Sequence, residues 1–227
     1  MINKKILFMG RANCETSKKI ILFLKKIFNQ VDIFTSKNSF TKPNKKILSW
    51  HGDYIFCFRS FYILKKNFIK KAKFAAINFH PGSPKYRGIG CVNFAILKNE
   101  KKYGSTAHVI DENIDSGKII NVKYFSIKKN DGVESILNKT YYHQYLQFIS
   151  IVSQLARSDS SLQRLIKSSK KEKWSKKLNT RKDLNKLYDI KANTSKKMLD
   201  LILRATITKK YKPYIKIFKK KFFYCAQ

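Results

Sequence analysis

Cysteines are few in this sequence, and they lie far apart. Cys14, Cys57, Cys91 and Cys225 form no Cys-x-x-Cys pair and no Cys/His cluster with the spacing of metal ligands. The pattern therefore predicts no metal site. Cys57 lies within an apolar run and is expected to be a small buried residue, and nothing in the spacing requires disulfides.

Long apolar segments are absent as well. No run approaches the roughly 18 to 20 residues that a helix needs to cross a bilayer. The apolar start at residues 6–9 leads into Gly10-Arg11 without the apolar core or cleavage pattern of a signal peptide. We therefore expect no membrane insertion and a cytoplasmic location.

Acidic residues and arginines are scarce, although the chain is strongly basic. There are 14 Asp and Glu against 49 Lys and Arg, which gives a formal net charge of +35 and suggests a nucleic-acid partner. However, residues 1–125 carry +17 and residues 126–227 carry +18, so the excess is spread evenly. Only 7 basic residues are Arg, the usual ligand of phosphates and base edges. The composition favours a solvated lysine surface, which would still attract anionic substrates at low salt.

The two common glycine-rich phosphate-binding patterns are missing. Gly10 is not followed by the further glycines of a G-x-G-x-x-G run, which argues against a classical dinucleotide site. The stretch Gly88-Ile89-Gly90 lacks the Walker pattern. It indicates a close approach of the backbone to a ligand or to a neighbouring element.

What the sequence does contain favours a packed chain with an α/β fold. Its 227 residues are 43% hydrophobic, enough for one substantial core or a main domain with a small appendage. Because strands alternate with helices, we predict a mostly parallel twisted sheet with helices on both faces and ligands at the carboxyl ends of its strands. The expected strands are residues 5–9, 31–34, 53–58 and 75–79, and a helix of about 14 residues begins near Thr16 or Ser17.

The second half of the chain predicts a continuation of this core and then an extension. We expect helices or helical turns at residues 63–72, 93–97 and 133–155, and extended structure at 105–110 and 118–127. This gives a core of residues 1–157 and an extension of residues 158–227. The extension is predicted to contain a turn at 158–161, a basic linker at 167–177, a helix at 195–203, and strands at 214–218 and 222–224 joined by a basic turn at 219–221.

One strand end carries side chains suited to chemistry. Asn78 and His80 are two positions apart, so they project to the same face of the strand while Ile77 and Phe79 face the interior. If the fold brings Asp115 alongside, its carboxylate would hold the imidazole in a defined tautomer and favour its charged form. An amide, an imidazole and a carboxylate together suit acyl transfer.

Three blocks of sequence, in order, resemble the folate-dependent formyltransferases. They are Asn78-x-His80, the turn Pro84-x-Tyr86-Arg87-Gly88, and Gly104-Ser105-Thr106-Ala107-His108 leading into Asp111–Gly117. The family includes glycinamide ribonucleotide formyltransferase, methionyl-tRNA formyltransferase and nucleotide-sugar N-formyltransferases. The resemblance implies a formyltransferase-type Rossmann-like core and N10-formyltetrahydrofolate as co-substrate, with no metal.

The resemblance also implies roles for individual residues. A substrate amine would attack the formyl carbon, while Asn78 and protonated His80 stabilise the oxyanion. Asp115 would favour the imidazolium and relay a proton through an ordered water. His108 would either support the site or have a purely structural role.

Binding residues carried over from the resemblance fall on three loops. Folate would contact main-chain groups of Phe61, Tyr62, Ile63 and Leu64. Asp111 would either touch the pteridine or fix the loop that carries Asp115. The substrate would contact the segment after His80, where Pro81-Gly82-Ser83-Pro84 replaces the Ser-Leu-Leu-Pro of many members. The residues expected there are Gly82, Ser83, Lys85, Tyr86 and Arg87, and Arg87 could instead hold its own turn through a salt bridge.

Segments after the core resemble small sugar N-formyltransferases, notably Trp174-Ser175-Lys176-Lys177. We therefore predict formylation of a nucleotide-linked amino sugar, dTDP-linked in the first instance, destined for a surface polysaccharide such as the O-antigen of lipopolysaccharide. Glycinamide ribonucleotide and methionyl-tRNA are alternative acceptors, and a polyanion-binding protein on the same fold is the alternative outside enzymology. The terminal strand pair offers an edge for a homodimer.

Overall fold

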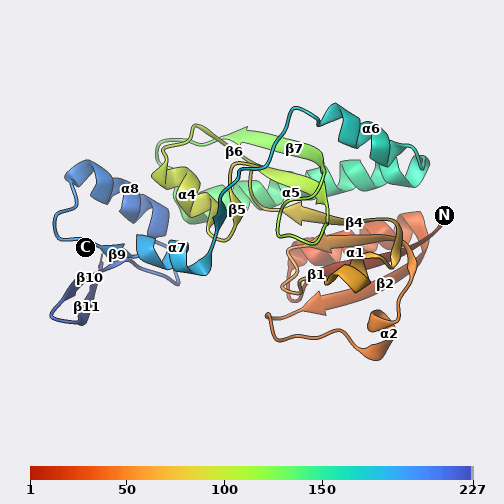
Figure 1. Ribbon diagram of the computed structural model, residues 1–227, viewed down its shortest axis with the longest axis horizontal. Coiled ribbons are helices and arrows are strands. Elements are labelled where there is room, and N and C mark those ends of the chain that lie inside the picture. Colours follow the sequence, from red (N-terminus) through yellow and green to blue (C-terminus); the bar gives the residue numbers. More distant parts are fainter. Residues whose placement is uncertain (226–227) are drawn as a thin grey trace.

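A six-stranded sheet forms the centre of the computed structural model, which describes residues 1–225 (Figure 1). Its strands are β1 Ile2–Arg11, β2 Phe28–Ser36, β3 Gly52–Phe58, β4 Ala72–His80, β6 Lys102–Val109 and β7 Ile119–Ser126. Their order across the sheet is β2-β1-β3-β4-β6-β7. The first four run parallel, whereas β6 is antiparallel to β4 and β7 to β6. The predicted α/β fold with a mostly parallel sheet is confirmed.

Side chains of the parallel strands alternate between two buried cores. In β1, Ile6 and Phe8 belong to one core, and Leu7 and Met9 belong to the other. This double burial explains why the strands are continuous apolar runs in the sequence. Helices that contribute to the first core are α1 Glu15–Ile27, α5 Val133–Arg157 and α6 Ser161–Ser168, and the short helices α2 Lys45–Leu48 and α3 Lys66–Ile69 contribute to the second.

The core elements are longer or shorter than the apolar patterns alone predict. β1 has 10 residues because backbone pairing with its neighbours continues past the apolar run. The first helix begins at Glu15, just before the predicted start, and passes directly into β2 after Ile27. Only four residues of the expected helical segment 63–72 form α3. The helix expected at 93–97 is α4 Cys91–Leu97.

Helix α6 continues the core beyond residue 157, where the sequence suggested a turn and then a linker. Leu162 is buried in the same core as Phe148 of α5, and Leu165 and Ile166 pack against that core. Ser169 Oγ, just after the helix, donates to the Ile120 carbonyl of β7. The division of the chain at residue 157 remains a prediction.

The C-terminal part beyond α6 contains two further helices and a small sheet (Figure 1). These elements are α7 Arg181–Leu187, β9 Asp189–Ile190, α8 Lys196–Thr206, β10 Tyr214–Ile217 and β11 Lys220–Phe223. The expected strand pair is present, but its turn is Phe218–Lys219, not 219–221. Both turn residues have positive φ, 45° and 66°, as a two-residue hairpin turn with the right twist requires.

Residues 174–179, here called the strap, connect this C-terminal part back to the central sheet. The strap ends in β8 Leu178–Asn179, which pairs parallel with β5 Arg87–Gly88. The Ser175 N–H donates to the Pro84 carbonyl at 2.8 Å. In Figure 1 this segment crosses from α6 over the strands toward α7. Within the described range, no helix has the combined length and apolarity needed to cross a membrane.

Candidate active site

The carboxyl end of β4 presents two polar side chains on one face. Ile77 and Phe79 are fully buried in the core shared with α5, so Asn78 and His80 project to the opposite face. Antiparallel pairing with β6 sets His108 directly opposite Asn78. Asn78 Nδ2 lies 3.2 Å from His108 Nε2. The alternation predicted for this strand is therefore confirmed. The pairing of β4 with β6 also places the imidazole of His108 beside Asn78.

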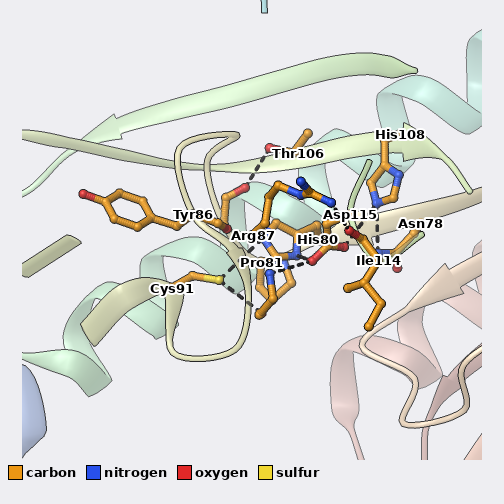
Figure 2. A network of polar contacts seen from close by, with 12 residues as sticks. Asn78, His80, Pro81, Tyr86, Arg87, Cys91, Thr106, His108, Ile114 and Asp115 are labelled. Carbon is orange, nitrogen blue, oxygen red and sulfur yellow. Dashed lines mark hydrogen bonds and ion pairs between the residues drawn. The ribbon is translucent and has the colours of Figure 1, made fainter. Parts of the chain in front are cut away.

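Asp115 reaches this group from the loop between β6 and β7. Its backbone is left-handed, with φ of 47°. Asp115 Oδ2 lies 3.2 Å from His80 Nδ1, and Oδ1 lies 3.5 Å from His108 Nε2 (Figure 2). The Gly88 N–H donates to the same Oδ2 at 2.9 Å. The structure thus brings Asn78, His80, His108 and Asp115 together, as expected from the sequence.

Both ring nitrogens of His80 lie beside hydrogen-bond acceptors, and Nε2 is also 3.6 Å from the Cys91 sulfur, whose own S–H donates to the Gly88 carbonyl. Nδ1 faces the Asp115 carboxylate, and Nε2 lies 2.9 Å from the Tyr86 carbonyl oxygen. Each nitrogen must therefore carry a proton, which makes the ring an imidazolium. Burial opposes this charge, but the Asp115 carboxylate, Cys91 and the Tyr86 carbonyl outweigh it and raise the pKa of His80 to about 9.

The Asp115 carboxyl is held ionised by the same contacts. Its side chain is buried, which alone would raise the pKa, but His80, His108 and the Gly88 N–H hold the pKa of Asp115 well below its usual range. His108 Nδ1 lies 2.9 Å from the Val109 carbonyl and donates to it. With Nδ1 as the donor, Nε2 can accept a hydrogen bond from the Asn78 amide.

A cavity opens against three of these four side chains. Asn78, His108 and Asp115 line it together with residues of the loops after β3 and β6. It holds about 150 Å³, below the roughly 300 to 1,000 Å³ of typical small-molecule sites, so it accommodates the reactive end of a ligand. His80 is 4% exposed and lies behind this lining.

The residues expected to bind folate mostly border the same cavity. Tyr62, Ile63, Leu64 and Asp111 line it. Phe61 does not, because the Arg11 guanidinium stacks on its ring at 4.3 Å. Asp111 Oδ1 accepts hydrogen bonds from the Asn113 N–H and the Ser116 hydroxyl. The loop-fixing contact expected of Asp111 is therefore present.

Residues expected to bind the acceptor lie around His80 rather than in the cavity. A Cβ at Gly82 would crowd His80 Nε2, so this glycine lets the chain pass close to the ring. Tyr86 is 7% exposed, and its hydroxyl donates to Glu100 at 2.9 Å. Arg87 donates to the carbonyls of Ile114 and Ser175 and forms no salt bridge with its own turn.

The other two expected acceptor-binding residues border a separate surface hollow. Ser83 and Lys85 line it together with Lys102 and Lys171, and Lys85 pairs with Glu100 at 2.9 Å. A direct contact of any of the five with an acceptor remains a prediction. In the same turn, the Tyr86 carbonyl contacts His80 and the Gly88 N–H contacts Asp115.

Trp174 of the strap contacts both imidazoles of the site, and no such contact was predicted from the sequence. Its ring lies edge-on to His108 at 5.0 Å and to His80 at 5.8 Å between centroids. Its Nε1 donates to the Gly117 carbonyl at 2.8 Å. The sequence signal available for Trp174 was its composition, because a large aromatic residue inside a lysine-rich segment indicates that its ring packs against the protein.

Comparison with known proteins identifies the family. The family model described as "Formyl transferase" matches residues 11–152, well over half of the chain. This chain belongs to the formyl transferase family. Between residues 1 and 225 no three His, Cys, Asp or Glu side chains gather as a metal site would require.

Two curated relatives match parts of the chain. The "Trifunctional purine biosynthetic protein adenosine-3" of Chironomus tentans is 32% identical over 117 residues, covering 51% of this chain and 8% of that protein. The "GDP-perosamine N-formyltransferase" of Brucella melitensis is 28% identical over 104 residues, covering 45% and 40%. The chain therefore spans less than half the length of either relative.

A solved formyl transferase shares the fold over nearly the whole chain. The N-formyltransferase from Helicobacter canadensis, determined with folinic acid and dTDP-3-aminofucose, superposes with a TM-score of 0.69 at 24% identity. The superposition covers 97% of this chain and 86% of that one. The shared fold thus includes the C-terminal part as well as the central sheet.

Proposed function

We propose that this protein transfers a formyl group from N10-formyltetrahydrofolate to the amine of a nucleotide-linked amino sugar. The observation that carries the proposal is the convergence of Asn78, His80, His108 and Asp115 at one cavity in a formyl transferase fold. The acceptor class is supported by the likeness to the Helicobacter canadensis enzyme, whose title names a dTDP-linked aminofucose.

The reaction needs an oxyanion donor and a proton acceptor, and the cavity lining offers both. The neutral amine attacks the formyl carbon, a C–N bond forms, and negative charge develops on the formyl oxygen. The Asn78 amide, at the cavity wall, donates to that oxygen. Asp115, held as a carboxylate, accepts the proton lost by the amine through a water. The same proton goes to N10 as its bond to carbon breaks, giving the formamide and tetrahydrofolate.

His80 acts mainly through its charge in this arrangement. Its two N–H groups are already bonded to Asp115 and to the Tyr86 carbonyl. The imidazolium keeps Asp115 ionised and adds positive potential behind the formyl oxygen. The direct hydrogen bond to the oxyanion that the sequence suggests would require the Tyr86 carbonyl to release Nε2.

The binding of folate follows the lining of the cavity. Tyr62, Ile63 and Leu64 line the cavity together with Asn78 and Asp111, and we expect main-chain groups of the first three to hold the pteridine. Phe61, stacked on Arg11, lies at the margin. The lysine-rich surface then assists by attracting anionic folate and nucleotide.

The test is turnover with N10-formyltetrahydrofolate and a panel of acceptors. We expect formylation of one or more dTDP- or GDP-linked amino sugars, and activity lost by orders of magnitude in Asp115→Asn with the fold retained. Turnover of glycinamide ribonucleotide or methionyl-tRNA alone would replace the proposed acceptor, and the purine-biosynthetic relative makes the first a specific alternative. Absence of turnover with every acceptor would favour the polyanion-binding alternative and overturn the proposal.

We further propose a cytoplasmic homodimer that serves the assembly of a surface polysaccharide such as the O-antigen. β11 is the edge of the β11-β10-β9 sheet, and Phe222 within it is 52% exposed. An exposed strand edge with apolar side chains can pair with a second copy. Sedimentation of the full chain tests the dimer, which a monomer at all concentrations would exclude.

A further inference from the structure

A second, larger cavity lies in the C-terminal part of the chain. α4, α5, α7 and the terminal hairpin bound it, and it holds about 580 Å³. This volume falls within the range of about 300 to 1,000 Å³ that small-molecule sites have. It shares no lining residue with the cavity at Asn78. Its apolar side consists of Val133, Leu137 and Leu184.

Four aromatic rings also line this second cavity. Tyr188 and Tyr211 meet edge to face with centroids 6.3 Å apart. Tyr214 and Phe223, paired across the hairpin, meet at 5.6 Å. Tyr211 remains 53% exposed. Partly exposed rings of this kind offer stacking surface to a planar ligand.

Cationic side chains surround the same rings. Arg181, Lys210, Lys212 and Lys221 line the cavity, and none of them forms a salt bridge with a carboxylate of residues 1–225. Lys221 Nζ lies 4.4 Å from the Tyr214 ring centroid. The acidic lining residue Glu134 already accepts from the Lys209 N–H at 2.8 Å. The cavity therefore combines a net positive charge, four cationic side chains against one carboxylate, with aromatic surface.

The hairpin turns a specific pair of side chains toward this cavity. Lys221 and Phe223 are two positions apart in β11, so they share a face, and both line the cavity. Lys220 and Phe222 occupy the other face and do not line it. Neighbouring lysines in one strand thus differ in a way that an experiment can use.

We propose that the second cavity binds a mononucleotide, with its base stacked on the Tyr188 and Tyr211 side and its phosphates at Lys210, Lys212 and Lys221. A simple anion would contact the cationic side chains but not the aromatic rings. An apolar ligand would leave four cations unneutralised in its binding site. A nucleoside diphosphate or triphosphate uses both features, and its size suits the volume. The proposal does not depend on the formyl acceptor.

The experiment is calorimetric titration of the full chain with dTDP, GDP, thymidine and inorganic pyrophosphate. We expect a nucleoside diphosphate to bind at least tenfold more tightly than thymidine or pyrophosphate. Tyr211→Ala and Lys221→Gln should each weaken that binding about tenfold, because a stacked base contributes roughly 1 to 3 kcal/mol. The matched variant Lys220→Gln should bind like the parent. Hydrogen exchange should show protection in residues 208–223.

Several results would overturn the proposal. Equal affinity for pyrophosphate and dTDP would reveal a non-specific lysine surface, as would equal losses in Lys220→Gln and Lys221→Gln. If a single-stranded oligonucleotide bound more tightly per phosphate than dTDP, the surface would be a binding site for single-stranded nucleic acid and not for a mononucleotide. Variants that change the sedimentation of the chain but not nucleotide affinity would assign the cavity to a contact between copies. If the proposal failed in any of these ways while Tyr211→Ala still transferred formyl groups, the proposed function would stand and only the second site would be rejected.

Discussion

The indole N–H of Trp174 donates a hydrogen bond of 2.8 Å to the carbonyl of Gly117, two residues beyond Asp115. One side chain of the strap therefore ties down the loop that supplies the carboxylate. The same ring lies edge-on to both imidazoles. A residue far along the chain thus fixes groups that come from β4, β6 and their connecting loops.

Replacing Trp174 should reduce formyl transfer without unfolding the protein. In Trp174→Ala the Asp115 loop loses its hydrogen bond and water gains access to His80, so we expect kcat to fall about tenfold or more. Trp174→Phe keeps ring contacts but loses the N–H donor, so its kcat should lie between that of the parent and that of Trp174→Ala. Steady-state kinetics measure kcat, and the thermal midpoint shows that each variant is folded. A kcat equal to that of the parent in both variants would contradict this prediction.

Protonation of His80 should make stability depend on pH in the alkaline range. Its pKa is about 9 in the folded chain against 6.5 as the ordinary value. The imidazolium therefore stabilises the fold fully below about pH 6.5, and this contribution, on the order of 3 kcal/mol, is lost as pH rises through 9. Urea unfolding at pH 6 and pH 9.5 should show a larger decrease for the parent than for His80→Gln. Equal decreases would show that His80 is not charged in the folded state.

Removing the Asn78 amide should affect catalysis far more than folding. The side chain lines the cavity and its only described hydrogen-bond partner is His108. Loss of one oxyanion donor lowers kcat roughly 100- to 1,000-fold, so Asn78→Ala should show that loss with a near-parental thermal midpoint. Asn29→Ala, on the exposed edge of β2, is the matched control and should retain activity. A kcat within threefold of the parent would remove Asn78 from the mechanism.

Gly88 should tolerate no side chain, since its φ is +82° and a Cβ would overlap the Asn179 carbonyl of the strap. We expect Gly88→Ala to lower the free energy of unfolding by about 2 kcal/mol and to reduce activity, because the Gly88 N–H also holds Asp115. Gly132→Ala is the control, because nothing lies within 4 Å of a Cβ there. Equal unfolding free energies for the two variants would refute this account.

The sequence predicts the centre of the site well because local rules govern it. Two-residue alternation places Asn78 and His80 on one face, and burial of Ile77 and Phe79 confirms it. Asp115 was identified from its sequence motif, which resembles that of the formyltransferases. The protonation state of His80 needed the structure, because it depends on the Tyr86 carbonyl.

Other features depend on contacts that no local pattern encodes. β5 and β8 are two-residue strands about ninety positions apart, and neither is visible in the sequence as a strand. Helix α6 is short and mostly polar, so its three apolar residues were insufficient to distinguish it from a turn and a linker. The hydrogen bond of the Tyr86 hydroxyl to Glu100 and the burial of its ring were also not predicted, and its contact with an acceptor remains a prediction.

The strap also has a consequence for biosynthesis. Residues 1–157 hold the amide, both imidazoles and the carboxylate, yet Trp174 and the partner strand of Arg87–Gly88 come afterwards. A ribosome-bound chain that has exposed only residues 1–157 would lack the Trp174 hydrogen bond to the Asp115 loop and the strand that pairs with Arg87–Gly88. We therefore expect the Asp115 loop and the turn at Arg87 to reach their final arrangement only after the segment through Asn179 has left the ribosome.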